Sequence, residues 1–259
     1  MYNIRLIEYP NGTCQIRKYS VPVATGITTK SKVKAKEEIE PFTNTKVKVV
    51  SEFANQKDNQ RKSLLHTKSM IFYYARCCRW EWFCTFTFSP EKIDRYDFAL
   101  CMKKIRNWLK NQRNRHAPDL KYLVVPETHK DGAWHLHVLL ADTGEMTFVD
   151  SGKKYLEQTI YNLSGWKWGF STATKVTDTY RIQTYIAKYV TKESHALSKN
   201  AHRYYVSRNL PKAKESLFLV EPTEEKEFLE HLVNSLDLEI KYSKEVESAF
   251  VTVAYMELQ

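Results

Sequence analysis

The sequence predicts an α+β fold built on a central antiparallel β-sheet, with helices packed mainly on one face. Strand-like apolar runs alternate with amphipathic helical patterns between residues 81 and 192. Two of the runs, residues 121–127 and 134–140, are separated only by a short turn that contains Asp131-Gly132. Asp-Gly in so short a connection is typical of a hairpin, which makes these two strands antiparallel.

The first 79 residues are expected to form three successive pieces. Residues 2–24 predict a hairpin that turns at Asn11-Gly12. Residues 25–56 are polar and predict a loop or linker with room for one short helix. Residues 57–79 predict a basic helix, which either follows a DNA backbone or braces the sheet. The inward stripe of this helix consists of Leu64, Leu65, Met70, Ile71, Tyr74 and Ala75.

The central region begins with a strand at residues 81–88. A helix is expected at residues 94–114, with Asp94 as its N-cap and Pro118 just beyond its end. Two further elements are expected after the hairpin of residues 121–140: a short helix at residues 153–163 and a strand at residues 168–176.

The last part of the chain predicts a helix at residues 223–236 and strands at residues 237–243 and 248–257. These patterns divide the chain into an N-terminal segment (1–79), a central domain (80–210) and an acidic C-terminal extension (211–259).

The charge is unevenly spread, although the whole chain carries +10. Residues 211–259 hold 5 Lys+Arg and 11 Asp+Glu, a net charge of −6, so the remainder carries +16. A basic body favours binding to a phosphate backbone. The acidic tail suits a folded cap, a partner-binding surface or a competitor for a DNA groove. Aromatic residues interleave with basic ones at residues 73–76 and 166–168, where they either stack unpaired bases or pack in a core.

Five cysteines, with no CxxC pair among them, predict reduced core thiols rather than disulfides or a zinc site. No signal peptide heads the chain, and no apolar run approaches membrane-spanning length. We therefore expect the protein in the cytoplasm of a bacterial cell, including a cell that hosts a phage.

Two histidines, His135 and His137, are the most informative residues of the sequence. They lie two apart in the strand of residues 134–140, so both imidazoles project from one face while Trp134 and its apolar companions face a core. Neighbouring imidazoles on one face suit a divalent metal, although hydrogen-bonded strand histidines give the same pattern.

Glu127 ends the preceding strand of the predicted hairpin. Antiparallel pairing would place it beside the start of the histidine strand, where its carboxylate can complete a ligand set of two imidazoles and one oxygen. Such a set accepts Mg²⁺ or Mn²⁺ and leaves positions for a phosphate oxygen. The alternative is a solvated turn residue.

Residues 177–192 predict an amphipathic helix that Thr177 or Asp178 caps. Tyr185 and Tyr189 lie one turn apart on its apolar stripe, and Lys188 flanks both. Buried hydroxyl groups need polar partners, so these phenols either complete a core or face a metal that helps a phenol act as a nucleophile.

Three motifs thus occur in order: a strand with Thr85 and Thr87, the histidine pair, and a helix with Tyr-x-x-Lys at residues 185–188. Together they resemble the motifs of rolling-circle replication initiators (Rep proteins) of the HUH endonuclease superfamily, over roughly residues 80–210. The second tyrosine, Tyr189, is similar to that of two-tyrosine initiators of some single-stranded DNA phages. The resemblance implies an HUH Rep-like fold, related to the ferredoxin and RRM folds, with the tyrosine helix across the metal site.

The resemblance also implies a metal-dependent DNA endonuclease and strand transferase. Tyr185 would attack a phosphate of single-stranded origin DNA, Lys188 would help to position that phosphate, and Tyr189 would perform a second transfer or simply pack. The implied metal, Mg²⁺ or Mn²⁺, would be held by His135, His137 and Glu127. The chain contains no Walker A loop, so a host helicase is expected as a partner together with a polymerase.

Two other functions remain open at this point. A transposase or relaxase of the HUH type would use the same chemistry on different DNA. A non-catalytic module that binds single-stranded nucleic acid would rely on stacking and charge alone, without metal.

Overall fold

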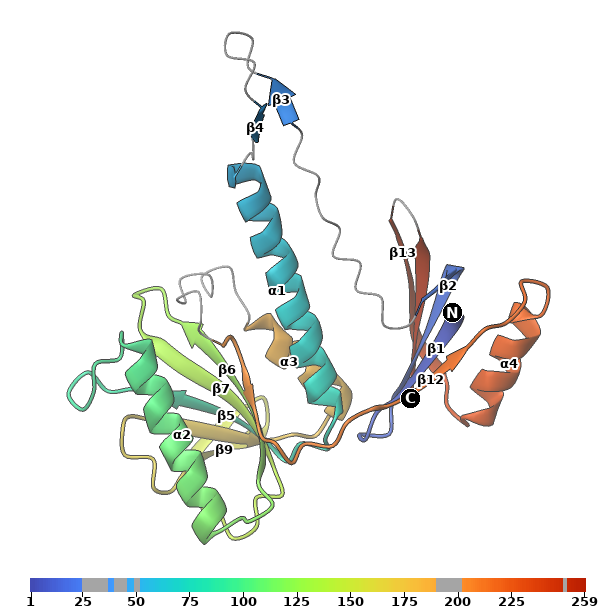
Figure 1. Ribbon diagram of the computed structural model, residues 1–259. Coiled ribbons are helices and arrows are strands. Elements are labelled where there is room, and N and C mark those ends of the chain that lie inside the picture. Colours follow the sequence, from blue (N-terminus) through green and yellow to red (C-terminus); the bar gives the residue numbers. More distant parts are fainter. Residues whose placement is uncertain (25–36, 40–45, 49–51, 190–201, 249–250) are drawn as a thin grey trace.

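The structure is a computed structural model of the 259-residue chain, and it describes residues 1–24, 37–39, 46–48, 52–189, 202–248 and 251–259 (Figure 1). The described part contains a seven-stranded sheet, a five-stranded sheet and a two-stranded ribbon of β3 (Glu37–Ile39) and β4 (Lys46–Lys48). None of its helices combines the length and apolar character that crossing a membrane requires.

The seven-stranded sheet carries the candidate site. Its strand order is β11-β6-β7-β5-β10-β9-β8, and its pairings are antiparallel. The strands are β5 (Trp82–Thr87), β6 (Lys121–Thr128), β7 (Trp134–Ala141), β8 (Phe148–Tyr155), β9 (Gln158–Leu163), β10 (Ser171–Lys175) and β11 (Tyr205–Val206). The predicted antiparallel α+β class is therefore confirmed.

Strand β7 is buried along its whole length because its side chains alternate between two cores. Trp134, Leu136 and Val138 pack in the core under α2 (Phe98–Arg115). The opposite face carries His135, His137 and Leu139, and its core includes residues of α1 (Glu52–Arg76) and α3 (Thr179–Lys188).

Helices thus lie on both faces of this sheet, with α2 on one side and the neighbouring α1 and α3 on the other (Figure 1). The sequence pointed to helices mainly on one face, and the structure adds α1 and α3 above the histidines. Helix α1 braces the sheet through buried Ile71 and Ala75, whereas Leu65, expected inward, is 57% exposed.

The five-stranded sheet joins the two ends of the chain, in the order β12-β1-β2-β14-β13. The predicted hairpin of residues 2–24 is confirmed as β1 (Tyr2–Glu8) and β2 (Cys14–Val23). The C-terminal segment supplies β12 (Lys214–Phe218), α4 (Glu225–Ser235), β13 (Ile240–Glu247) and β14 (Thr252–Leu258). Helix α4 packs on a core around Ile4 and Ile16. Strands of the 1–79 and 211–259 segments therefore share one sheet, and the three-part division of the chain remains a proposal.

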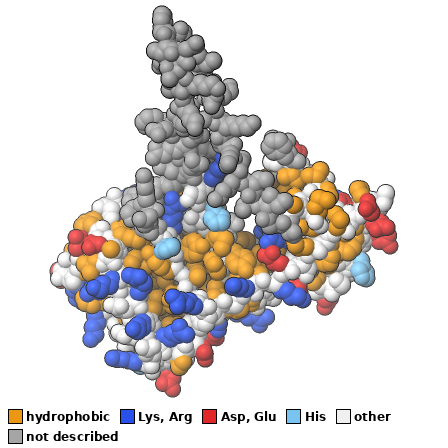
Figure 2. Space-filling view, viewed as in Figure 1, with side chains coloured by type: hydrophobic (Ala, Val, Ile, Leu, Met, Phe, Trp, Pro, Cys, Tyr) orange, Lys and Arg blue, Asp and Glu red, His pale blue; other side chains and the backbone are white. Residues whose placement is uncertain are grey.

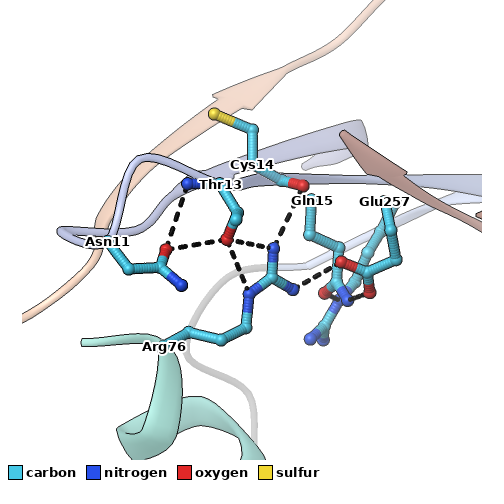
Figure 3. A network of polar contacts seen from close by, with 7 residues as sticks. Asn11, Thr13, Cys14, Gln15, Arg76 and Glu257 are labelled. Atoms are coloured by element: carbon cyan, nitrogen blue, oxygen red, sulfur yellow. Dashed lines mark hydrogen bonds and ion pairs between the residues drawn. The ribbon is translucent and has the colours of Figure 1, made fainter. Parts of the chain in front are cut away.

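Arg76, the last residue of α1, connects that helix to the five-stranded sheet (Figure 3). Its guanidinium is fully buried and donates to Thr13 Oγ1 at 2.7 and 3.0 Å and to the carbonyl of Cys14 at 3.2 Å. It also forms an ion pair with Glu257 of β14 and lies 3.8 Å from the centre of the Tyr9 ring. The contacts of one side chain thus join both termini of the chain to the helix.

The prediction of a short helix at residues 153–163 is wrong. The segment contributes to the β8–β9 hairpin, whose turn at Leu156 and Glu157 has positive φ angles of 44° and 64°. Positive φ at both turn residues matches the twist of a two-residue hairpin, but neither residue is one of the usual signals for it. Strand β12 was also missed.

Asp94 does not cap the second helix, as the sequence had suggested. The helix begins one turn later, and Asp97 accepts a hydrogen bond from the backbone N–H of Leu100. Asp94 instead accepts from the backbone N–H of Tyr96 in the preceding turn. The five cysteines are free and buried, as predicted. The predicted loop falls mostly outside the described residues, and so does the end of the tyrosine helix.

Candidate metal and tyrosine site

The β6–β7 hairpin brings Glu127, His135 and His137 together. In the register of this hairpin Glu127 lies directly opposite His135, as the sequence predicted. Glu127 Oε2 lies 2.8 Å from His135 Nε2 and 2.9 Å from His137 Nε2, and the two imidazole nitrogens are 3.1 Å apart. Three donor atoms therefore converge on one point from the face of the sheet.

This geometry fits a divalent metal ion. Neighbouring ligands around one ion lie about 3.0 Å apart when each is about 2.1 Å from it, as for Mg²⁺. The observed separations of 2.8–3.1 Å agree with that spacing. Within the described part of the chain this is the one group of three His, Cys, Asp or Glu side chains that converges in this way. The cluster can bind a metal ion, with further positions open to water or phosphate.

The electrostatics favour the ligand forms of these side chains. Burial alone would raise the pKa of Glu127, but hydrogen bonds from His135 and His137 outweigh it and lower that pKa to about 2. Burial lowers the pKa of His137, because the charged imidazolium is poorly solvated there. Near neutral pH the pair therefore offers a carboxylate and a neutral imidazole, the forms that bind metals.

Side chains of β5 and the β6–β7 turn fix the imidazoles. Thr85 Oγ1 lies 3.3 Å from His137 Nδ1, on the side of the ring away from Glu127. The Phe83 ring stacks near His137, at 5.8 Å between ring centres. His129 lies 4.0 Å from the His135 ring, a contact that its place in a turn did not predict. Phe83 was also missed, although its spacing of two from Thr85 places it on the histidine face.

Helix α3 places both predicted tyrosines beside this cluster. Asp178 caps its start by accepting from the backbone N–H of Arg181 at 2.9 Å. The Tyr189 ring, just past the helix end, stacks on His137 with 3.4 Å between ring centres. Tyr185 lies 5.3 Å from Tyr189 in an edge-on contact and is 42% exposed. The helix therefore presents one phenol against the histidines and a second one toward solvent.

The two phenols differ in their surroundings. Burial, followed by the hydrogen bond with Tyr185, raises the pKa of Tyr189 far above its usual range. The ammonium group of Lys188 lies 5.6 Å from the centre of the Tyr185 ring. Tyr185 is thus the phenol with a cation beside it and access to solvent.

A cavity of about 650 Å³ opens beside Tyr185, between α3 and strands β9 and β10. Lys175, Arg181 and Lys188 supply positive charge to its wall. The tip of the β8–β9 hairpin contributes Tyr155 and Leu156, which are 66% and 80% exposed. Exposed apolar groups beside cations make a surface suited to unpaired nucleotides.

Comparison with known proteins agrees with this site. Residues 81–194 match a family model of replication-associated proteins, the family that is named for ORF2 and the gene 2 protein. The predicted resemblance to Rep proteins is confirmed over this segment, which contains all three motifs and both tyrosines. Neither curated proteins nor solved structures give a significant match. A role in DNA replication is therefore the functional class that the family match supports.

Proposed function

We propose that the protein is a rolling-circle replication initiator that nicks and rejoins single-stranded origin DNA through a covalent phosphotyrosine. One observation carries the proposal: two phenols of a single helix lie beside three converging metal donors on the sheet. The Tyr189 ring touches that of His137, and Tyr185 follows at 5.3 Å from Tyr189.

Glu127, His135 and His137 are the residues that would hold Mg²⁺ or Mn²⁺. A bound ion there would polarise the scissile phosphate and favour the phenolate form of a tyrosine. Oxygen and imidazole ligands together suit Mn²⁺, and the open positions also suit Mg²⁺.

Tyr185 is the proposed nucleophile of the first step. Its phenol oxygen forms a bond to phosphorus as the bond from phosphorus to the 3′ oxygen breaks. The phenol proton passes to solvent, and the departing 3′ oxygen takes up a proton to become a free hydroxyl. The 5′ phosphate stays on Tyr185, and Lys188 offsets its charge.

Rejoining is the reverse transfer, in which a 3′-hydroxyl attacks the phosphotyrosine and releases Tyr185. Tyr189 is the proposed nucleophile for a second transesterification, by which a completed circle is released. The free 3′-hydroxyl of the first nick is a primer for a host polymerase, with a host helicase opening the duplex. The cavity beside Tyr185 is the proposed path of the strand next to the scissile phosphate.

An adduct assay tests this proposal. The full chain is incubated with Mn²⁺ and labelled single-stranded origin DNA, and a DNA-linked band is sought after denaturation. Tyr185→Phe should abolish the band, and addition of a chelator should do the same. Tyr161→Phe is a matched control, because Tyr161 packs against Trp82 in the core below α2 and should leave the band intact.

Two results would overturn it. A band of normal intensity from Tyr185→Phe, together with loss in Tyr189→Phe, would reverse the roles of the tyrosines. DNA binding without any adduct, unaffected by chelator, would favour a non-catalytic module that binds single strands by stacking and charge.

A further inference from the structure

A second cavity, of about 490 Å³, lies on the face of the sheet opposite the histidines. Helix α2 and the loop between β9 and β10 form its walls, and we call it the α2 pocket. The side chains that give it its character are Lys104, Trp108, Gln112, Arg115, Lys167 and Trp168.

The α2 pocket is strongly basic. Lys104, Arg115 and Lys167 line it, and none of its described lining residues is an Asp or Glu. Helix α2 itself has six Lys and Arg residues and no acidic one. Figure 2 shows Lys and Arg side chains gathered over the face that α2 occupies in Figure 1.

An indole N–H inside the pocket is without a partner. Trp108 is 6% exposed, and its Nε1 donor is buried with no hydrogen bond to the described residues. A buried donor without an acceptor costs about 1–3 kcal/mol, so such a group commonly marks a place for a missing partner.

Two donors point at the same space. A Cβ atom placed at Gly165, which has φ of +80°, would lie 3.9 Å from Trp108 Nε1 and 3.7 Å from Gln112 Nε2. The absence of a side chain at Gly165 thus leaves room for an acceptor between these two N–H groups. Beside this space Lys104 lies 3.7 Å from the centre of the Trp168 ring.

We propose that the α2 pocket binds a phosphate of the DNA backbone, as a contact separate from the cleavage site. Cations, neutral N–H donors and a partly exposed indole are the groups that hold phosphates and neighbouring bases. The pocket and the tyrosines lie on opposite faces of the sheet, so one DNA molecule would pass around the sheet to reach both. The inference adds an anchor to the proposed nicking function without taking part in its chemistry.

Binding measurements on matched variants test this inference. The background is the full chain with Tyr185→Phe and Tyr189→Phe, so that labelled DNA stays uncut during anisotropy titrations over a range of salt. Lys104→Gln with Lys167→Gln removes two pocket cations and should lower the slope of log Kobs against log salt by about 1 to 2. The control, Lys103→Gln with Lys110→Gln, removes two exposed cations of α2 outside the pocket and should change the slope by less than about 1. Equal effects of the two pairs would overturn the proposal.

The indole N–H supplies a direct readout. Trp108→Phe removes the donor without changing charge and should weaken DNA binding about tenfold, as for one hydrogen bond to a charged group. In the background chain, the one of six indole N–H signals in a ¹⁵N spectrum that this variant lacks should shift on addition of DNA. A shift with inorganic phosphate but not with DNA would indicate a site for free anions, and no shift would refute an anion site; both outcomes contradict the proposal.

The two proposals fail separately. If the wild-type chain forms an adduct while the pocket and control variants bind DNA alike, only the α2 anchor is refuted. If the pocket behaves as expected but no adduct ever forms, only the nicking function is refuted.

Discussion

Two threonines on β5 meet different partners although both face the histidines. Thr85 Oγ1 lies 3.3 Å from His137 Nδ1. The Thr87 hydroxyl instead bonds with the backbone carbonyl and N–H of Phe170, both at 3.1 Å. A partner on the second ring nitrogen fixes the orientation of a metal-binding imidazole. Thr85 is therefore expected to support the metal site, whereas Thr87 supports the loop before β10.

Replacing each hydroxyl by a methyl group tests this difference. Thr85→Val should weaken Mn²⁺ binding by about tenfold, because the His137 ring loses the group that orients it. Thr87→Val, the matched control, should leave Mn²⁺ affinity within about twofold of wild type. Isothermal titration of the full chain with Mn²⁺ measures both. Equal losses in the two variants would mean that the threonines act only through the strand.

Glu127 is the anionic member of the proposed ligand set. Glu127→Gln keeps the shape of the side chain but removes its charge, so Mn²⁺ affinity should fall by at least about tenfold. Glu145→Gln, at an exposed carboxylate outside the cluster, is the control and should bind Mn²⁺ normally. Unchanged Mn²⁺ affinity in Glu127→Gln would exclude Glu127 as a ligand.

At the residue scale, the sequence predicted the cluster better than its surroundings. Strand alternation placed His135 and His137 on one face, and the Asp-Gly hairpin brought Glu127 opposite His135. The stacking of Tyr189 on His137 was beyond such rules. It depends on how α3 is rotated over the sheet, which tertiary packing against α1 decides and local periodicity does not.

The junction at the end of α1 is the most heavily bonded contact between an element and the five-stranded sheet. Arg76 is buried against Glu257, which Gln15 also contacts. A buried cation of this kind does not guarantee stability, because its desolvation offsets much of the attraction. Removing it, however, leaves a buried carboxylate without its cation.

Arg76→Gln should therefore lower the free energy of unfolding by about 3–5 kcal/mol. Arg79→Gln, three residues on and exposed, should change it by no more than about 0.5 kcal/mol. Urea unfolding followed by circular dichroism gives both values. A small effect of Arg76→Gln would mean that water readily replaces the lost contacts at this junction.

The β8–β9 hairpin shows why one element escaped prediction. Both strands are largely exposed, so they lack the alternation of apolar and polar residues that marks a strand against a core. The turn residues Leu156 and Glu157 adopt positive φ without Gly or Asn. The hairpin is instead fixed by its pairing and by β9 lying beside β10, which are long-range facts.

At the scale of the whole molecule, the acidic tail is a folded part of the protein. Strands β12 and β14 flank the N-terminal hairpin, and α4 covers their core. Of the three roles the sequence left open for the tail, a folded cap agrees with this arrangement. The pairing of chain ends was not predictable, because nothing local in either segment specifies a partner some 200 residues away. The basic charge lies outside this tail and is available to DNA.

The central claim is that a phenol of α3 attacks a phosphate beside the metal donors, and mapping the adduct tests it most directly. Trypsin cleaves after Arg181, Lys188 and Lys192, so Tyr185 and Tyr189 fall into different peptides, residues 182–188 and 189–192. After reaction with Mn²⁺ and single-stranded origin DNA, nuclease trimming and mass spectrometry would locate the attached nucleotide. We predict it on the 182–188 peptide. A nucleotide on residues 189–192 alone, or on no tyrosine of the chain, would contradict the assignment.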